Sequence, residues 1–259
     1  MAWTRRYEEA EPQRVNRWLA QSGVCSRREA EALIIDGLVS IDGERVEDAG
    51  RKIQPGQTLT LADRAEAQLG SSISVMLNKP VGVVSAQPEG QQVPAARLLT
   101  AERQWGDGAQ IPARDASLAP LGRLDQDSHG LLILSEDGVL AKALIGPESD
   151  LEKEYLVRVK GALEESVIAR LRHGLSLDGR QLRPAKVSRV EPQRLRFILK
   201  EGRNRQIRRM CELVGLEVTD LYRLRIGPLK VGNLPEGKWR ALMPQEREAL
   251  IAASRKPPL

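Results

Sequence analysis

The sequence of 259 residues has few of the residues that mark several large classes of protein. It contains two cysteines and two histidines, each pair far apart in the chain, so neither a disulfide framework nor a metal site is expected. The charged and polar first twelve residues do not resemble a signal peptide, and no apolar run approaches membrane-spanning length. We therefore expect a cytoplasmic protein with no cofactor and no membrane partner.

Aromatic residues are also scarce, at 3% of the chain. Any stacking on nucleic-acid bases must therefore use a few rings, such as that of Tyr155, or arginine planes. Basic residues outnumber acidic ones, and the net charge of +5 with a pI near 9.4 favours a polyanionic partner. The excess is concentrated in residues 194–209, where seven basic residues against one acidic residue give a local charge of +6. This block alone exceeds the net charge of the whole chain.

The chain is long enough for one large domain and a small one. Residues 1–12 are expected to be disordered. A short amphipathic helix follows, and Ser26 with Glu29 has the spacing of a capping box, which predicts a second helix. Two short strands are then predicted, at residues 39–41 and 59–61. These elements make a compact N-terminal unit.

Residues 13–62 resemble the small RNA-binding domain named after the fourth ribosomal small-subunit protein, most clearly in the run Ser22–Ala30. Acidic and basic residues balance across this segment, but its first part, up to Arg28, holds four arginines and no acid. A solvated helix face is the alternative interpretation of this pattern. Residues 63–72 are expected to be a linker, and residues 73–259 the large domain. The candidates for phosphate contacts are Arg14, Arg17, Arg27 and Arg28.

A polar segment followed by an apolar run is the first place in the large domain where chemistry is expected. The run Leu131–Leu134 predicts a buried strand, and Asp125 and Asp127 lie in the loop before it, just after Arg123. A loop anchored on a rigid strand often carries catalytic groups. From the spacing alone, an ordinary surface turn rich in Asp, Ser and Gly is the simpler interpretation. The spacing also does not choose between the two carboxylates.

Three further segments are informative. Asn-Lys-Pro-x-Gly at residues 78–82 predicts a tight change of direction between apolar runs. Residues 154–159 alternate as a strand with Tyr155 pointing inward, where core packing is its simplest role. Residues 205–215 have apolar side chains at i, i+3, i+4 and i+7, which predicts a helix with one buried stripe. The arginines of this helix are expected on the opposite or flanking surface.

Taken together, these strings resemble the RNA pseudouridine synthases of the ribosomal small-subunit synthase A type. The resemblance extends from about residue 13 to residue 242. It implies an α+β fold with a mixed, largely antiparallel central sheet, flanking helices and the small N-terminal domain. The strings that carry it are Gly-Arg-Leu-Asp and Asp-Ser-x-Gly-Leu-Leu around Asp125, Asn-Lys-Pro-x-Gly, Lys-x-Tyr, and Gln-Ile-Arg within residues 206–208.

The resemblance also implies roles for individual residues. Asp125 would attack the target nucleoside, and Tyr155 would pack against the target uracil. Arg208 would form an ion pair with Asp125, and Arg123 would fill the space that the flipped base leaves. Asn-Lys-Pro-x-Gly would support the active site structurally. Other arginines near the last motif are further candidates for RNA contacts, namely Arg203, Arg205 and Arg209.

The implied activity is the isomerisation of uridine to pseudouridine in ribosomal RNA, with base flipping and without a cofactor. A sugar adduct on Asp125 and removal of a ribose proton by Asp125 remain alternative routes. Within the family, Glu-Lys-Glu-Tyr and Asn-Arg-Gln-Ile-Arg-Arg-Met-Cys-Glu are most similar to the large-subunit synthase F branch, which modifies 23S rRNA and can act on a tyrosine tRNA. A monomer is expected, acting on naked RNA or on an assembly intermediate. The alternatives are the same chemistry on 16S rRNA and a non-catalytic RNA-binding or ribosome-assembly protein.

Overall fold

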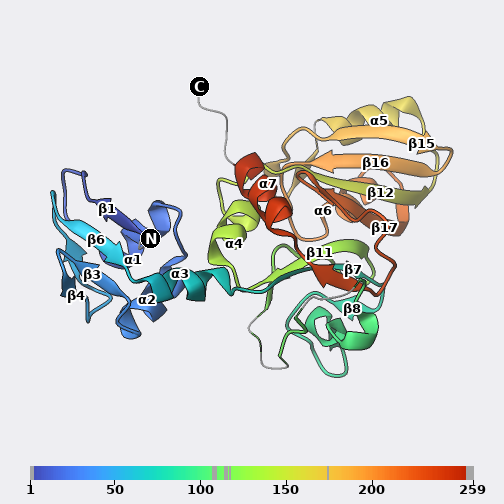
Figure 1. The fold of residues 1–259 in the computed structure, drawn as a ribbon. Coiled ribbons are helices and arrows are strands. Elements are labelled where there is room, and N and C mark those ends of the chain that lie inside the picture. The colour runs from blue at the N-terminus through green and yellow to red at the C-terminus, as the bar shows by residue number, and fades with distance from the viewer. Residues whose placement is uncertain (1–2, 107–109, 114–115, 117, 174, 255–259) are drawn as a thin grey trace. The chain divides into compact units, whose positions relative to one another are not determined.

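The computed structural model describes residues 3–106, 110–113, 116, 118–173 and 175–254 (Figure 1). Within them the chain divides into two compact units. The first unit takes in the described residues up to Ser74 together with Ser135–Lys142. The second takes in Val75–Leu134 and the described residues from Ala143 onward. In the part of the chain that the structure describes, no helix is both long and apolar enough to cross a membrane.

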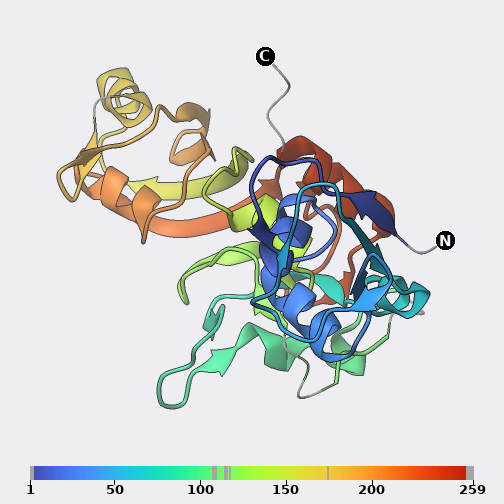
Figure 2. The same ribbon diagram turned by 90° about the vertical axis from the view of Figure 1, so that its left-hand side faces the viewer.

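The first unit combines small antiparallel sheets with short helices (Figure 2). Its main sheet has the order β1–β6–β3–β4, and β2 pairs with β5. The predicted capping box is confirmed, because Glu29 N donates to Ser26 Oγ and Ser26 N donates to Glu29 Oε2. The elements are β1 (Thr4–Arg6), β2 (Gln13–Arg14), α1 (Val15–Gln21), α2 (Arg27–Ile35), β3 (Val39–Ile41), β4 (Glu44–Arg45), β5 (Lys52–Ile53) and β6 (Thr58–Leu61).

Residues 3–12 include a paired strand and a buried tyrosine, which corrects the prediction of a disordered segment at residues 1–12 for the part that the structure describes. Strand β1 pairs with β6, and Tyr7 is buried. The Tyr7 and Trp3 rings lie 5.3 and 6.0 Å from that of Trp18 in α1. These aromatic contacts complete the core of the first unit, although charged neighbours surround them in the sequence. Residues 1–2 of the predicted segment lie outside the described residues.

Residues 63–72, predicted to be a linker, consist mostly of a helix, α3 (Asp63–Gly70). Acidic Asp63 and Glu66 occupy its first turn, where they interact favourably with the helix dipole. Ala65 is fully buried in the core of the first unit, and Leu69 packs against that core. The segment is therefore part of the packing of the first unit.

The second unit is organised around one long sheet with the order β15–β16–β12–β17–β11–β7–β19. Strand β12 is antiparallel to both of its neighbours, whereas β11 and β17 are parallel. The predicted mixed, largely antiparallel sheet is thus confirmed. The strands are β7 (Ser74–Lys79), β11 (His129–Ser135), β12 (Lys153–Lys160), β15 (Lys186–Glu191), β16 (Arg194–Leu199), β17 (Glu217–Ile226) and β19 (Trp239–Ala241). Short strands outside this path are β8 (Val83–Val84), β9 (Val93–Pro94), β10 (Ala119–Pro120), β13 (Ser176–Leu177), β14 (Arg180–Gln181) and β18 (Leu229–Lys230).

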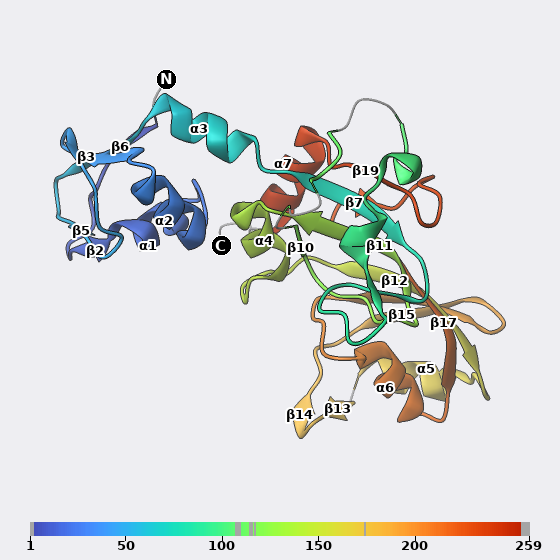
Figure 3. The same ribbon diagram turned by 90° about the horizontal axis from the view of Figure 1, so that it is seen from below.

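Helices α5 and α6 lie side by side against the sheet (Figure 3). Arg170 in α5 donates a hydrogen bond to Leu213 O at the end of α6, at 3.3 Å. The predicted apolar stripe of α6 is confirmed, since Ile207, Met210 and Cys211 are buried. The helices are α4 (Gly138–Ile145), α5 (Glu165–Arg172), α6 (Gln206–Glu212) and α7 (Pro244–Ser254), with the 3₁₀ turns η1 (Ala95–Leu98) and η2 (Ala101–Arg103).

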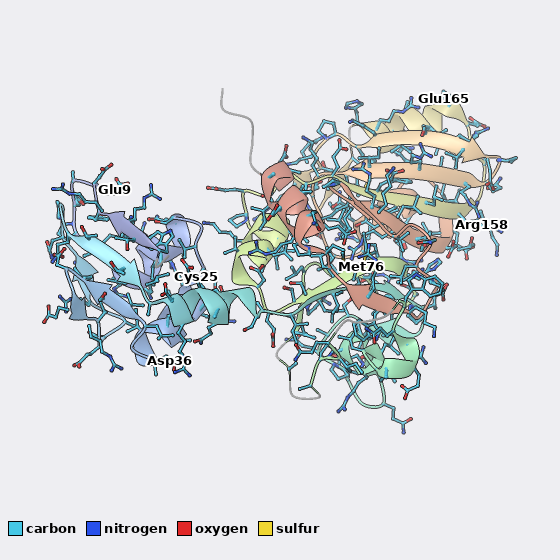
Figure 4. All side chains as sticks on the ribbon, in the orientation of Figure 1. Glu9, Cys25, Asp36, Met76, Arg158 and Glu165 are labelled. Carbon is cyan, nitrogen blue, oxygen red and sulfur yellow. The ribbon has the colours of Figure 1, made fainter. Side chains whose placement is uncertain are left out.

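The two cysteines are buried, Cys211 in α6 of the second unit and Cys25 in the first unit, where Figure 4 labels it. Burial raises the pKa of each thiol to about 12. We expect neither thiol to react with 5,5′-dithiobis(2-nitrobenzoate) in the native protein at pH 8, and both to react once urea unfolds the chain. Absorbance at equilibrium and during unfolding measures this. A prompt reaction of one thiol in the native protein would contradict the burial of that residue.

Candidate active site

A cavity of about 790 Å³ lies in the second unit. Its walls come from the loop before β11, the loop before α6, and the strands β12 and β17. The structure brings together in this cavity most of the residues that the sequence predicted for the site, which are Arg123, Asp125, Tyr155, Arg203, Arg205 and Arg208. The described residues contain no cluster of three or more His, Cys, Asp or Glu side chains suited to a metal ion.

The loop that carries Asp125 is held through its backbone on both sides of that residue. Ser85 Oγ donates to Leu124 O at 2.7 Å and accepts from Leu124 N at 2.8 Å. Gly82 N donates to Gln126 O at 2.8 Å. The backbone position of Asp125 therefore does not depend on contacts of its own side chain.

Lys79 fixes the segment that makes these contacts. Its buried ammonium donates to Pro80 O at 2.9 Å and to Val83 O at 2.6 Å. Burial and the charge of Arg223 lower the pKa of Lys79 to about 8, while nearby carboxylates, including that of Asp125, act in the opposite direction. The prediction that Asn-Lys-Pro-x-Gly supports the site structurally is confirmed by these bonds.

The arginine that pairs with Asp125 is Arg205, at 3.6 Å between NH1 and Oδ2. The sequence-based expectation was Arg208, whose guanidinium instead lies 3.2 Å from Asp127 Oδ1. Arg208 also donates to Asp127 O at 2.8 Å and to Ser128 Oγ at 3.2 Å. The predicted ion pair between Arg208 and Asp125 is therefore corrected. Arg208 holds the far end of the loop that carries Asp125, and it is buried rather than on the outer surface of α6.

The local backbone explains why Arg205 reaches the carboxylate. Arg205 precedes α6 and has a left-handed backbone with φ of +47°. Few residues other than glycine adopt this conformation, and they do so at an energetic cost. The helical periodicity assumed in the sequence analysis begins one residue later, at Gln206. The direction of the Arg205 side chain thus could not follow from the helix pattern.

Asp127 is bound by two guanidinium groups. Arg205 NH2 lies 3.1 Å from its Oδ2, and Arg208 contacts its Oδ1. Partial burial acts to raise the pKa of Asp127, but the hydrogen bond from Arg205 and the charges of both arginines outweigh it, and the pKa falls below its ordinary value. The carboxylate of Asp127 therefore has a structural partner on each oxygen.

Tyr155 lies on β12 and is 9% exposed. Its neighbours across the sheet are Phe197 on β16 and Arg223 on β17. The side chain is thus packed in the sheet and also lines the cavity. Both interpretations of Tyr155 from the sequence, core packing and a surface for the base, are compatible with this position.

Arg203 and Arg209 are engaged within the protein. Arg203 donates to the carbonyl oxygens of Leu177, Arg180 and Gln181, and Arg209 forms a two-pronged pair with Asp178 at 3.0 and 2.6 Å. Both arginines therefore hold the β13–β14 hairpin, which projects from the second unit in Figure 3. Contact of these two residues with RNA stays a prediction. The four arginines predicted to bind phosphate in the first unit are exposed, on β2, α1 and α2.

Comparison with known proteins decides the family. The family model described as RNA pseudouridylate synthase matches residues 73–213, and the S4 domain model matches residues 13–59. The chain belongs to the RNA pseudouridine synthase family. It is therefore an isomerase that converts uridine to pseudouridine in RNA, as the resemblance predicted.

Several relatives are similar to this pseudouridine synthase over most of their own length. Dual-specificity RNA pseudouridine synthase RluF of Escherichia coli K12 is 35% identical over 237 residues, which cover 90% of this chain and 76% of the relative. Ribosomal large subunit pseudouridine synthase B of Bacillus subtilis is 32% identical over 246 residues, 93% of this chain and 96% of the relative. A crystal structure of a pseudouridylate synthase matches with a TM-score of 0.63 and 26% identity, covering 92% of this chain and 99% of that one.

Four basic residues that line the synthase's cavity were not among the predicted site residues, namely Lys153, Arg183, Lys200 and Arg223. Arg223 is 2% exposed, although arginine is seldom buried unless it is paired. A signal was present, because Arg223 lies two residues after Leu221 in an alternating strand and so shares its buried face. The alternation of leucine with arginine was interpreted only as a strand pattern.

Ser85→Ala tests how the synthase positions Asp125. We expect turnover to fall about 10-fold and stability by about 1–2 kcal/mol, because the variant leaves both backbone groups of Leu124 without their buried partner. Single-turnover kinetics and urea unfolding measure the two effects. Ser166→Ala, which removes an exposed hydroxyl of α5, is the matched control and should change neither. Unchanged turnover in Ser85→Ala would show that Leu124 needs no anchor.

Proposed function

We propose that this pseudouridine synthase isomerises a uridine of 23S rRNA in the cytoplasm, and that it belongs to the small-subunit synthase A branch near synthase F. The observation that carries the proposal is the cavity that holds Asp125, Tyr155 and Arg205 together. The name of the Bacillus subtilis relative supports a large-subunit target. The words "dual-specificity" in the name of the Escherichia coli relative support a second RNA, such as a tRNA.

Asp125 is the proposed reactive carboxylate. A carboxylate that acts as nucleophile or base must be ionised and accessible to the sugar. Both oxygens of Asp127 already contact arginines at 3.1 and 3.2 Å, whereas Asp125 forms a longer ion pair with Arg205, at 3.6 Å. The Arg205 guanidinium offsets the loss of hydration that Asp125 undergoes when RNA closes the cavity.

The atoms of the reaction balance within the nucleoside. The bond from C1′ of the ribose to N1 of uracil breaks, the base turns, and a bond from C1′ to C5 forms. C5 then loses its proton and N1 gains one, so no redox partner is consumed. A covalent bond from Asp125 to the sugar and removal of a ribose proton by Asp125 both satisfy this balance.

Tyr155 and Arg123 would hold the flipped nucleotide and the RNA around it. The Tyr155 ring, partly open to the cavity, offers a face for the uracil. Arg123 is exposed at the same cavity, two residues before Asp125, and its planar guanidinium can stack where the base has left the helix. Removing a base from its stack costs a few kcal/mol, which these contacts offset.

We propose that residues 13–62 bind RNA as a small separate domain and that residues 73–259 form the catalytic domain. The extents of the two family matches support this division. In the first domain, phosphate contacts are assigned to Arg14, Arg17, Arg27 and Arg28. A monomer is the proposed active form.

The experiment that tests the target uses transcripts of 23S rRNA, 16S rRNA and tRNA. Each is incubated with the purified protein, treated with a carbodiimide that marks pseudouridine, and read by reverse transcription. We expect a new stop at one position of 23S rRNA. Stops in 16S rRNA alone would overturn the target. Binding to every transcript without any stop, repeated on ribosome-assembly intermediates, would favour the non-catalytic RNA-binding protein.

A further inference from the structure

Two cations of the cavity have neither a part in the proposed chemistry nor an acidic partner among the described residues. Lys153 and Arg223 both line it, on the neighbouring strands β12 and β17. Lys153 lies two residues before Tyr155, and Arg223 pairs directly with Tyr155 across the two strands. A register shift between Glu154 and Tyr155 produces this pairing. The ring proposed to hold the uracil therefore has a basic side chain next to it along its own strand and another across the sheet.

The guanidinium of Arg223 is buried and only partly satisfied. Its Nε donates to Leu131 O at 2.7 Å and its NH1 donates to Arg123 O at 3.2 Å. Its NH2 has no hydrogen-bond partner among the described residues. A buried charge is costly unless it is paired and its donors are satisfied. The unpaired NH2 of a cavity-lining arginine is therefore suited to an acceptor that arrives with the substrate.

No carboxylate compensates these two charges. Among the described residues, none lies within ion-pair distance of Lys153 or of Arg223, whereas Arg205 and Arg208 in the same cavity both have acidic partners. The Lys153 ammonium has one long contact, 3.5 Å to Leu151 O. Burial, and after it the charge of Arg223, lower the pKa of Lys153. The two cations thus repel each other until an anion lies between or beside them.

We propose that Lys153 and Arg223 form an anion subsite that binds a phosphodiester group of the substrate RNA next to the target uridine. The inference rests on the proposed function, since it requires RNA in this cavity. A phosphodiester has a permanent negative charge and oxygen acceptors that match an ammonium and a guanidinium N–H. It also flanks every internal uridine, so a base bound on Tyr155 brings one into the cavity. The bond from Arg223 to Arg123 O links the subsite to the loop that carries Asp125.

The test is a double-mutant cycle. One change is Lys153→Gln in the protein, and the other is a methylphosphonate in the RNA, which removes the negative charge of one phosphate. Binding is measured by fluorescence anisotropy over a range of KCl concentrations, with one RNA unmodified and one carrying a methylphosphonate next to the target uridine, on the 5′ or the 3′ side. We expect Lys153→Gln to weaken binding of the unmodified RNA about 10-fold and to reduce the salt slope by about 0.7, the value for one single-strand phosphate contact. One of the two methylphosphonates should weaken binding by the wild type and not by the variant.

Lys160→Gln is the matched control. It removes the same charge from the exposed end of β12, outside the cavity, and should change affinity less than twofold. Circular dichroism of both variants shows that they are folded, and the readout does not require a variant of buried Arg223. Additive effects of Lys153→Gln and of both methylphosphonates would overturn the subsite. Unchanged RNA affinity of Lys153→Gln together with a slower chemical step would also overturn it. That result would mean that the two cations stabilise negative charge on the departing uracil. In each case, pseudouridine formation by the wild type reports separately on the proposed function.

Discussion

Asp125→Asn is expected to abolish pseudouridine formation while leaving the fold and RNA affinity within a fewfold of the wild type. The amide has the shape of the carboxylate but neither its charge nor its basicity. Removing one residue of a catalytic unit in a well-studied protease lowers turnover by about 10⁴-fold or more, and we expect a loss of that order. Tritium release from RNA labelled at C5 of uridine measures turnover, because isomerisation expels the C5 proton.

The structure explains why folding should survive this change. The loop around Asp125 is fixed by Ser85 and Gly82 through backbone atoms. Asp127→Asn is the matched control two residues away, and it should slow turnover only about 10- to 100-fold, by loosening Arg205 and Arg208. Full activity of Asp125→Asn together with an inactive Asp127→Asn would reverse the assignment of the two carboxylates.

Local patterns in the sequence predicted local structure well. The capping box at Ser26, the buried stripe of α6 and the alternation around Tyr155 depend on residues within one or two turns of a helix or along one strand. Each pattern has a direct physical cause, such as a satisfied backbone N–H or an apolar face. The motif strings further predicted which segments lie together in one cavity, such as those that carry Asp125 and Tyr155.

Long-range contacts account for what the sequence did not predict. Strand β1 forms because Thr4–Arg6 pairs with β6, more than fifty residues later in the chain, and because Trp3 and Tyr7 meet Trp18. The charged residues around these aromatic rings are typical of a disordered start. Only the pairing partner, which no local window contains, makes order favourable.

The partners of charged residues were the hardest feature to predict. Arg205 and Arg208 are close in sequence, and the left-handed backbone at Arg205 decides which of them reaches Asp125. Arg203 and Arg209 belong to a basic segment typical of a nucleic-acid-binding surface, but their side chains bind the β13–β14 hairpin. A charge count records how many cations are present, whereas their acceptors depend on loop geometry. Sequence reasoning therefore identified the basic site more reliably than the role of each arginine.

Gly130→Ala is expected to destabilise the second unit by about 3–5 kcal/mol, a loss as large as those from severe core substitutions. Gly130 lies in β11 with φ of +108°, and a Cβ there would be 2.4 Å from Arg223 O and 2.7 Å from Arg223 N. These are backbone atoms of the parallel partner β17, so they cannot move aside without opening the sheet. Hydrogen exchange of β11 and β17 peptides in urea measures the loss.

Gly82→Ala separates the two causes of this loss. Gly82 has a similar φ of +90°, but nothing lies within 4 Å of the Cβ that alanine would add. It should therefore cost only the conformational penalty of about 1–2 kcal/mol for a side chain at positive φ. Equal losses in the two variants would attribute the effect to backbone conformation alone. A larger loss at Gly130 would attribute the excess to the close backbone contact between β11 and β17. The side chain of Arg223, at this same contact, donates to Leu131 O and to Arg123 O.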